Sequence, residues 1–318
     1  MTSSRTHTAD RPFVLPHGDA ATDGRRVLAD LLGADYSARA ITPQRSDQAP
    51  SVVRRALERF SPYDSRSKLD MARSWCVADH LDAGAIRAAT WDQAVASIGG
   101  LADRAHAADR FVIGLGGDHS VSWPLVEAAL RAARRRHGAS ARMGVIQLDV
   151  HHDVRPLDDG PSNGTPFRGL LETGVIRPDD LVQVGIHPFA NRPHLAAYCD
   201  ELMIRRFSLD EVAQLGPEET ARAAIRACAG TDEIYLSVDI DVLDRAFAPG
   251  TAAALPGGLD PRTLVTIVET VCADPRVTGM DVVEFDPQRD TADVTAYAVA
   301  HVVMAALAAL ARRAGPTE

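Results

Sequence analysis

The sequence has few of the features that mark secreted, membrane-bound or nucleic-acid-binding proteins. It contains only four cysteines in 318 residues, and their spacing matches no zinc-ligand or redox motif: Cys76, Cys199, Cys228 and Cys272. We therefore expect reduced core thiols and exclude a disulfide scaffold. No signal peptide is recognisable, and no apolar run is expected to reach about 18 residues, the length that suggests a membrane span. These absences predict a soluble cytoplasmic protein.

Positive charge is also in short supply. Lys and Arg total 34 against 43 Asp and Glu, which gives a formal net charge of −9. An acidic protein repels nucleic acid and anionic membrane surfaces, so the charge argues against both as main partners and favours a small-molecule substrate. The length suits one large α/β domain or two ordinary domains, and either size buries a full core.

Apolar runs of strand length alternate with helical periodicity along most of the chain. Strands are predicted at residues 27–34, 111–115, 143–149, 181–186, 202–206, 234–240 and 277–284, and helices at 50–60, 90–107, 123–136, 166–172, 217–229, 261–272 and 295–312. This alternation predicts right-handed crossovers and a three-layer α/β/α fold around a central, mainly parallel sheet. Residues 1–23 are mainly polar and are predicted to form a flexible or loosely packed tail. Because the composition shows no linker and no repeat, we predict a single domain over residues 24–318.

Residues 147–156, QLDVHHDVRP, carry three potential metal ligands at alternate positions. Asp149, His151 and Asp153 follow the apolar run 143–148, and on extended backbone their side chains would project to one face. Crowded acidic groups repel one another, and burying each without compensation costs on the order of several kcal/mol. A cation among them would offset this cost, so the stretch is interpreted as part of a metal site.

Two further stretches place ligand types just after predicted strands. His119 follows the strand at 111–115 within GGDHS, and Asp239 and Asp241 lie at the end of the strand at 234–240. Open α/β sheets bind ligands at the carboxyl ends of their strands, so the six side chains are expected to converge. Four carboxylates and two imidazoles suit two divalent ions, and the lack of cysteine disfavours structural zinc. Manganese is the first choice, with nickel, cobalt and zinc as alternatives.

Each motif also has an ordinary structural explanation. Paired glycines in GGDHS are common in tight turns, Asp239 and Asp241 could be helix caps or solvated acids, and alternating polar residues can mark an exposed strand edge. Taken singly, the first two motifs favour these explanations. Together, three ligand groups at three strand ends favour a metal site. His152 faces away from the set on extended backbone and is interpreted as structural.

In order and spacing, GGDHS, the D-x-H-x-D block and SVDIDVLDRAFAPGT at residues 237–251 resemble the ureohydrolase family, the arginases, agmatinases and their relatives. The resemblance runs from about residue 110 to the C-terminus. It implies an arginase-like fold, two manganese ions per subunit and a trimeric or hexameric homo-oligomer. It also implies six metal ligands, with Asp149 and Asp239 bridging the ions: His119, Asp149, His151, Asp153, Asp239 and Asp241.

Within that family, HHDVRPLDDGPSNGTPFRGLLE and DPQRDTADVTAYAVAH are similar to the formimidoylglutamase branch. Arginases and agmatinases carry a histidine before the glycine of the SNGTPFR loop, whereas this chain has Asn163. A proline commonly follows the position of Asp244 in guanidine-cleaving relatives, and Arg245 stands here. The resemblance therefore implies hydrolysis of N-formimidoyl-L-glutamate to L-glutamate and formamide, a step of histidine degradation.

Three acidic residues are predicted to act in this reaction. Glu284, in GMDVVEFDP, matches the family's acidic residue that faces the cationic amidine, from which it would accept a charge-assisted hydrogen bond. Asp153 or Asp241 would take a proton and return it to the leaving amine.

Substrate binding is predicted to involve an amide and two cations. Asn163 cannot shuttle protons but can donate and accept hydrogen bonds, which suits substrate orientation. Formimidoylglutamate carries two carboxylates, and Arg155 and Arg168 on either side of Asn163 are the predicted partners. The ordinary alternative for Arg168 is a pair with Glu172 one helical turn away.

Other functions remain open at this point. An amidinohydrolase of a guanidino compound, similar to guanidinobutyrase or agmatinase and releasing urea, is the alternative within the family. Related folds hold one zinc ion in an Asp, His, Asp set like Asp149, His151 and Asp239, which gives a deacetylase from a different reaction class. A metal-dependent binding protein without catalytic activity is the third possibility. The number of ions per chain and the product formed distinguish these functions.

Overall fold

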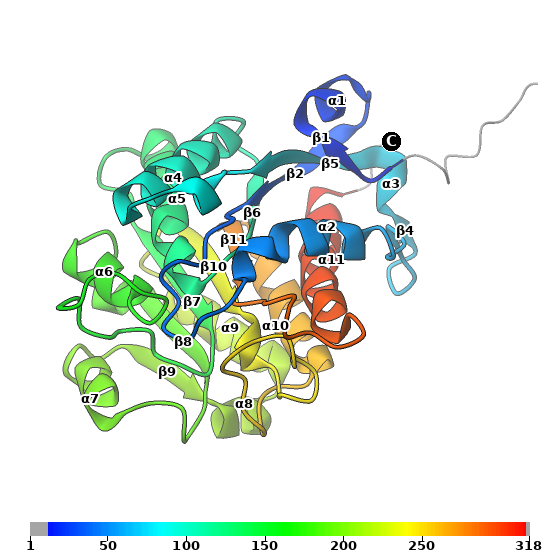
Figure 1. Ribbon diagram of the computed structural model, residues 1–318. Coiled ribbons are helices and arrows are strands. Elements are labelled where there is room, and N and C mark those ends of the chain that lie inside the picture. The colour runs from blue at the N-terminus through cyan, green and yellow to red at the C-terminus, as the bar shows by residue number, and fades with distance from the viewer. Residues whose placement is uncertain (1–11, 316–318) are drawn as a thin grey trace, which may run out of the picture.

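A parallel sheet of nine strands forms the centre of the protein (Figure 1). The computed structural model describes residues 12–315. The sheet strands are β1 (Val14–Pro16), β2 (Arg26–Gly33), β5 (Trp75–Asp82), β6 (Phe111–Leu115), β7 (Met143–Leu148), β8 (Leu181–Ile186), β9 (Arg205–Ser208), β10 (Glu233–Asp239) and β11 (Val277–Val283). They lie in the order β1-β5-β2-β6-β11-β10-β7-β8-β9, and every neighbouring pair is parallel.

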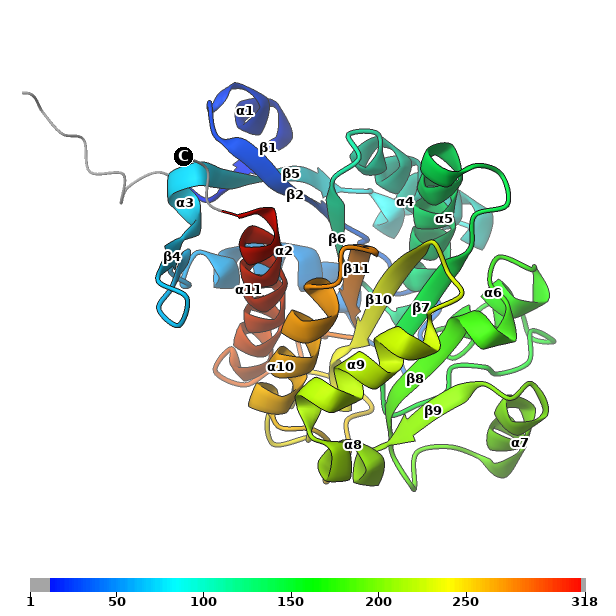
Figure 2. The same ribbon diagram turned by 180° about the vertical axis from the view of Figure 1, so that it is seen from behind.

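Helices cover both faces of the sheet (Figure 2). One layer contains α2 (Ala49–Leu57), α8 (Leu209–Leu215), α9 (Pro217–Ala227), α10 (Pro261–Cys272) and α11 (Val294–Ala314), and the other contains α4 (Trp91–His106), α5 (Ser122–His137), α6 (Pro166–Glu172) and α7 (Pro193–Glu201). Because both faces are covered, the central strands β7 and β10 are buried along their whole length and are mostly apolar. The predicted three-layer α/β/α fold is confirmed.

Shorter elements connect the layers. They are the helices α1 (His17–Thr22) and α3 (Met71–Ser74), the antiparallel pair β3 (Tyr63–Asp64) and β4 (Leu69–Asp70), and the 3-10 turns η2 (Ser46–Gln48), η3 (Ala85–Arg87), η4 (His119–Val121), η5 (Pro178–Asp180) and η6 (Ile240–Val242). The turn η6 directly follows β10, and η4 begins at His119, four residues after the end of β6.

Strand β5 is not among the strands predicted from the sequence. Its sequence, WCVADHLD, interleaves polar with apolar residues and so lacks a continuous apolar run. Asp79 within it is buried and accepts two hydrogen bonds, of 2.6 and 2.9 Å, from Arg54 of α2. A paired buried carboxylate is tolerated in a strand, but it conceals the apolar signal on which the prediction relied.

The N-terminal segment differs from the predicted tail where it is described. Residues 1–11 lie outside the described part of the chain. From Val14 onward the backbone forms β1, which pairs with β5, and then α1. A strand of three partly exposed residues is too short to produce a recognisable period. The boundary at residue 24 and the single domain beyond it stay predictions.

The closing helix α11 corrects the expectation that no segment has the length and composition of a membrane span. Its 21 residues pass that test, but 72% of the most apolar window is buried inside the protein. The helix packs against α2 and α10 in one of the covering layers, so its hydrophobicity serves the core. The four cysteines are buried as well, as predicted for core thiols.

A buried histidine in this core predicts a loss of stability in acid. His106 is 1% exposed, and burial, followed by the charge of Arg136, lowers its pKa from 6.5 to about 4. Between these values the unfolded chain binds a proton that the native protein does not, so the free energy of unfolding falls as the pH drops through this window. From pH 6.5 to 5 the expected loss is about 2 kcal/mol.

Urea unfolding of wild type and His106→Gln at pH 7 and pH 5 measures this contribution. Because other titrating groups are shared by both proteins, their effects cancel in the difference between the two pH dependences. The variant should lose about 2 kcal/mol less than wild type between these pH values. Equal losses in the two proteins would contradict the assignment to His106.

Candidate metal centre and active site

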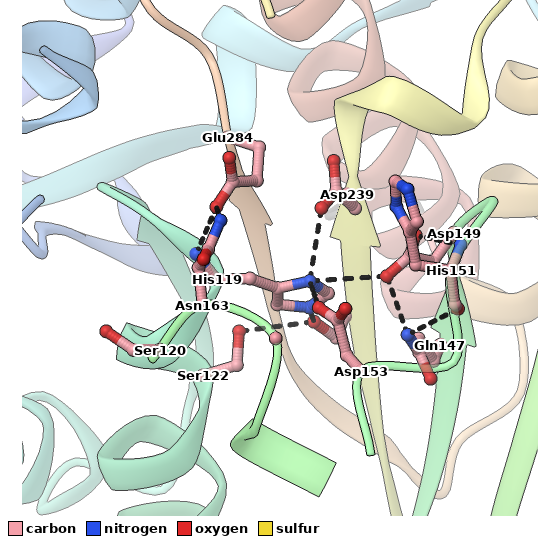
Figure 3. Close-up of polar contacts among 12 residues, drawn as sticks. His119, Ser120, Ser122, Gln147, Asp149, His151, Asp153, Asn163, Asp239 and Glu284 are labelled. Carbon is pink, nitrogen blue, oxygen red and sulfur yellow. Dashed lines mark hydrogen bonds and ion pairs between the residues drawn. The ribbon is translucent and has the colours of Figure 1, made fainter. Parts of the chain in front are cut away.

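The six predicted metal ligands and Glu284 lie at the carboxyl ends of four neighbouring strands. In the sheet these strands are adjacent in the order β6, β11, β10, β7. His119 follows β6, Glu284 follows β11, Asp239 ends β10 with Asp241 two residues later, and the other three ligands follow β7. Since parallel strands end at the same edge of the sheet, segments far apart in sequence meet there (Figure 3).

The first ligand group surrounds the Nδ1 atom of His119. This atom lies 2.8 Å from Asp153 Oδ2, 3.1 Å from Asp239 Oδ2 and 3.3 Å from Asp149 Oδ2. His119 is fully buried, yet its Nδ1 makes no hydrogen bond of acceptable geometry with any described residue. A buried nitrogen that makes no hydrogen bond and faces three carboxylate oxygens forms, together with them, a donor set that suits a cation.

A second ligand group shares Asp149 with the first. His151 Nδ1 lies 3.4 Å from Asp149 Oδ1 and 3.1 Å from Asp241 Oδ2. Asp241 Oδ1 is buried and has no hydrogen-bond partner among residues 12–315. Asp149 therefore belongs to both groups, as expected of a bridging ligand, whereas Asp239 belongs to the first group. Bridging by Asp239 stays a prediction.

The electrostatics of this cluster favour bound positive charge. Burial raises the pKa of Asp239 well above its usual range, and the charges of Asp241 and Asp149 raise it further. Burial alone would lower the pKa of His151, but Asp241 and Asp149 raise it to about 12. Four carboxylates with two imidazoles and no cysteine form a donor set that fits two divalent ions. Bound ions would offset the repulsion between the buried carboxylates, as bound protons do when no ion is present.

The backbone does not bring these ligands together in the way predicted. Strand β7 ends at Leu148, so Asp149, His151 and Asp153 lie in a loop rather than on extended backbone. Asp153 has a φ of 50°, in the left-handed region that is unfavourable for residues with a Cβ. The alternating spacing found the ligands, but a curved loop causes them to converge. Such backbone strain is common at functional sites.

The paired glycines of GGDHS serve the close packing of the same site. A Cβ on Gly117 would lie 1.7 Å from the carbonyl oxygen of Tyr36. The Asp118 amide also donates to that oxygen at 2.9 Å. The GGDHS motif is therefore both a tight turn and a segment that carries a predicted metal ligand. Gly117 allows the backbone to pack closely against Tyr36, in the segment after β2, two residues before His119.

Buried polar residues behind the ligands hold them in place, although no sequence motif marked them as functional. Gln147 donates a 2.6 Å hydrogen bond to Asp149 Oδ2. His119 Nε2 lies 3.1 Å from Ser237 Oγ, which donates to Asp281 at 2.8 Å. Such partners orient metal-binding side chains. Their signal was a polar residue inside an otherwise apolar strand, as at Gln147 in β7 and Ser237 in β10.

A cavity of about 130 Å³ opens at the ligands. Its walls include His151, Asp153, Arg155, Asn163, Asp239, Asp241 and Glu284, together with Ile41, Thr42, Gln44, Gly164, Ala252 and Ala253. Larger cavities elsewhere in the described residues, of about 810, 600, 260 and 150 Å³, are lined by none of the six ligands. Chemical composition rather than size therefore identifies the candidate active site.

Glu284 is held tightly in the wall of this cavity. It is 3% exposed, and burial raises the pKa of its carboxyl group. Its Oε1 accepts hydrogen bonds from the His119 amide at 2.7 Å and from Asn163 Nδ2 at 3.0 Å. Its φ of 66° is another left-handed value for a residue with a Cβ. These contacts fix the carboxylate beside the metal ligands.

Asn163 connects Glu284 to the segment after β2. Its side-chain Oδ1 accepts a 2.9 Å hydrogen bond from the backbone N–H of Ile41. The backbone N–H of Asn163 donates to the Arg39 carbonyl at 2.9 Å. The predicted substrate-orienting residue therefore lies in the cavity, but its side chain is largely engaged with the protein. Its contact with Glu284 places it where it can act on substrate geometry.

The structure separates the two predicted arginines. Arg155 lines the cavity, and its side chain crosses Gly164, where a Cβ would lie 2.6 Å from Arg155 Cδ. Arg168 does not line the cavity. It forms an ion pair with Glu172 on α6, and its guanidinium lies 3.8 Å from the ring centre of Tyr198. The ordinary alternative for Arg168, a pair one helical turn away, describes its position.

Another group of potential ligands lies near the β1 edge of the sheet. It contains His17, Asp30 and His80. Arg110 donates to both oxygens of Asp30, at 2.7 and 2.8 Å, and His80 Nε2 lies 2.7 Å from one of them. Although burial raises the pKa of Asp30, the contacts with His80 and Arg110 lower it. Because this carboxylate is already paired, we interpret the group as an ion-pair network.

The chain is similar to known proteins over nearly its full length. A sequence model described as "Arginase family" matches residues 29–309. Formimidoylglutamase of Halalkalibacterium halodurans is 36% identical over 313 residues, covering 93% of each chain. Proclavaminate amidinohydrolase of Streptomyces clavuligerus is 39% identical over 183 residues, 57% of this chain and 56% of that protein. The crystal structure of Bacillus subtilis formimidoylglutamase matches with a TM-score of 0.84 at 30% identity, covering 97% of this chain and 93% of that one.

Proposed function

The chain belongs to the arginase family, and on this premise we propose that it hydrolyses N-formimidoyl-L-glutamate to L-glutamate and formamide. The observation that carries the proposal is the contact of Asn163 with Glu284 in a cavity lined by the predicted metal ligands. Relatives named formimidoylglutamase match nearly the whole chain and support the same substrate. The enzyme is thus a C–N hydrolase acting on a linear amidine.

The cationic group of this substrate matches the acidic cavity. A protonated formimidoyl group carries N–H donors and a positive charge, and Glu284 can accept a charge-assisted hydrogen bond from it. The buried carboxylate is kept in position by its contacts with the His119 amide and Asn163. Glu284 would therefore hold the amidine carbon toward the ligands, which raises the fraction of bound substrate in a reactive orientation.

His119, Asp149, His151, Asp153, Asp239 and Asp241 would hold two divalent ions. When bound, such a pair lowers the pKa of water toward neutrality and stabilises negative charge that develops on the substrate. We propose manganese, because mixed carboxylate and imidazole ligands suit it.

The proton needed by the leaving amine can come from the same wall. Asp153 and Asp241 both line the cavity, and the buried Oδ1 of Asp241 has no partner among the described residues. We propose that one of these carboxylates takes a proton from the attacking water and returns it to the glutamate nitrogen as the C–N bond breaks. As the C=O bond of formamide forms, the second proton of the attacking water leaves its oxygen and passes to the amine, so the products are neutral formamide and glutamate with a protonated amino group. A histidine at position 163 is not required for this transfer.

Arg155 is the proposed partner of a substrate carboxylate. It lines the cavity, and no ion pair to an acidic side chain is found for it within residues 12–315. Replacing Arg155 with methionine should raise KM for formimidoylglutamate about tenfold to a hundredfold, with a smaller change in kcat, because a charge-assisted contact is lost. Steady-state kinetics measure both constants.

Arg168→Met is the matched control for this variant. Its guanidinium contacts Glu172 and Tyr198 away from the cavity, so KM should stay close to the wild-type value. An increase of KM in Arg168→Met equal to that in Arg155→Met would contradict the assignment of substrate binding to Arg155.

Several further properties complete the proposal. The reaction would belong to histidine catabolism in the cytoplasm, and the acidic net charge of −9 supports a small-molecule substrate rather than nucleic acid or a membrane. We also propose a homo-oligomer, a trimer or hexamer. Sedimentation of the purified protein measures this state directly, and a monomer would contradict it.

A substrate panel tests the proposed function. Purified protein loaded with manganese is assayed with formimidoylglutamate, agmatine, 4-guanidinobutyrate and arginine. Turnover of formimidoylglutamate with the largest kcat/KM is expected. Urea from a guanidino compound, with no turnover of formimidoylglutamate, would favour the alternative, which the similarity to proclavaminate amidinohydrolase over part of the chain supports.

A further inference from the structure

Gln44 forms part of the cavity wall beside Glu284, and no sequence feature predicted a role for it. It is buried, and its Nε2 donates a 2.8 Å hydrogen bond to Glu284 Oε2. An ionised carboxylate can only accept hydrogen bonds, so this contact fixes which end of the amide faces Glu284. The amide oxygen of Gln44 is therefore directed away from the carboxylate.

This oxygen is a buried acceptor without a partner. Gln44 Oε1 makes no hydrogen bond with any of the described residues, although buried polar atoms almost always have one. The neighbouring amide differs, because Asn163 Oδ1 accepts from Ile41 and its Nδ2 donates to Glu284. The cavity wall thus contains one amide oxygen that is satisfied by the protein and one that is left for another donor.

The hydrogen bonds of Glu284 explain why a second acceptor is needed. A carboxylate has about four acceptor positions. Those of Glu284 receive three donors from the described residues, the His119 amide and Asn163 on Oε1 and Gln44 on Oε2. One position remains, on Oε2. A protonated amidine presents several N–H groups, so a second one directed at this wall requires an acceptor other than Glu284.

We propose that Gln44 Oε1 accepts an N–H from the cationic amidine, next to the N–H that Glu284 accepts. Gln44 is then a substrate-binding residue whose amide joins the carboxylate on one side and the substrate on the other. The inference rests on the proposed function for the identity of the substrate. The contact itself involves only the amidinium group, so any planar amidinium cation that reaches the cavity should make it.

The test compares Gln44→Met with Gln48→Met. Methionine keeps the length of the side chain and removes the amide, and Gln48, which is not in the cavity wall, receives the same substitution as a control. Formamidinium binding to the manganese-loaded protein is measured by equilibrium titration. Gln44→Met should bind it about tenfold more weakly than wild type, and Gln48→Met should bind it equally. For formimidoylglutamate, KM of Gln44→Met should rise about tenfold with a smaller change in kcat.

Two results would overturn the proposal. Equal formamidinium affinity in Gln44→Met and wild type would mean that Oε1 binds only water. Weaker binding accompanied by loss of manganese, or by displacement of Glu284 in the structure of the variant, would mean that Gln44 acts only through the metal centre or through Glu284. Failure of the proposed function is distinguishable, because it is seen as absence of turnover in wild type, whereas the titration needs no turnover.

Discussion

Replacing Asp149 with asparagine is expected to remove both metal ions and nearly all activity. Asp149 is the residue that the two ligand groups share, and it is fully buried. Asparagine keeps the shape of the side chain but loses the negative charge that both ions require. We expect the manganese content to fall from about two ions per chain to less than one. We expect kcat/KM to fall by at least about a thousandfold, since metal ions contribute several kcal/mol to such reactions.

Metal analysis after dialysis, together with the substrate assay, measures this effect. Asp158→Asn is the control, because Asp158 is exposed in the loop that follows the ligands and belongs to neither group. Retention of two ions and full activity in Asp149→Asn would contradict the two-ion site. A single zinc ion in wild type, lost in Asp149→Asn but kept in His119→Ala, would instead favour the deacetylase alternative.

Replacing Glu284 with glutamine is expected to lower activity without removing metal. Glu284 lies in neither ligand group, but its carboxylate faces the same cavity. Glutamine removes the charge and places an N–H group among the three donors that now point at the carboxylate. The amidine then loses a charge-assisted hydrogen bond, and kcat/KM should fall about a hundredfold or more.

The comparison of metal content with activity separates this role from that of Asp149. Glu172→Gln is the control, because Glu172 is an exposed carboxylate that pairs with Arg168 on α6. Glu284→Gln should keep about two ions per chain and bind formamidinium more weakly than wild type. Unchanged formamidinium affinity would contradict the contact between Glu284 and the amidine.

The layered fold could be predicted because its central strands are buried on both faces. Runs such as that in β7 are apolar at nearly every position, and the helices between them have clear apolar stripes. The metal ligands could be found for a related reason, since each group follows such a run at the carboxyl end of a strand. The order of the strands then places those ends next to one another, which no local pattern reveals.

Other features depended on contacts between distant segments. β5 was missed because Asp79 interrupts its apolar run, and only its pairing with Arg54 makes that residue acceptable in the strand. Gln44 was missed because its partner, Glu284, lies 240 residues away in the sequence. The curvature after Leu148 also depends on tertiary contacts, and a spacing rule for extended strands could not predict it.

Arg155 and Arg168 show the same limit for substrate contacts. Both flank the loop of Asn163, and both are cations of the kind that binds carboxylates. On α6, Arg168 has a carboxylate partner, Glu172, one helical turn away. The side chain of Arg155 instead packs over Gly164 and lines the cavity. Sequence distance from the motif could not distinguish them, but backbone direction does.

The identity of the products tests the central claim most directly. Manganese-loaded protein is incubated with N-formimidoyl-L-glutamate, and the products are identified and quantified by nuclear magnetic resonance. We predict equal amounts of L-glutamate and formamide, with no reaction in the metal-free protein. Ammonia with N-formylglutamate, or no turnover of this substrate by fully loaded protein, would contradict the proposed reaction.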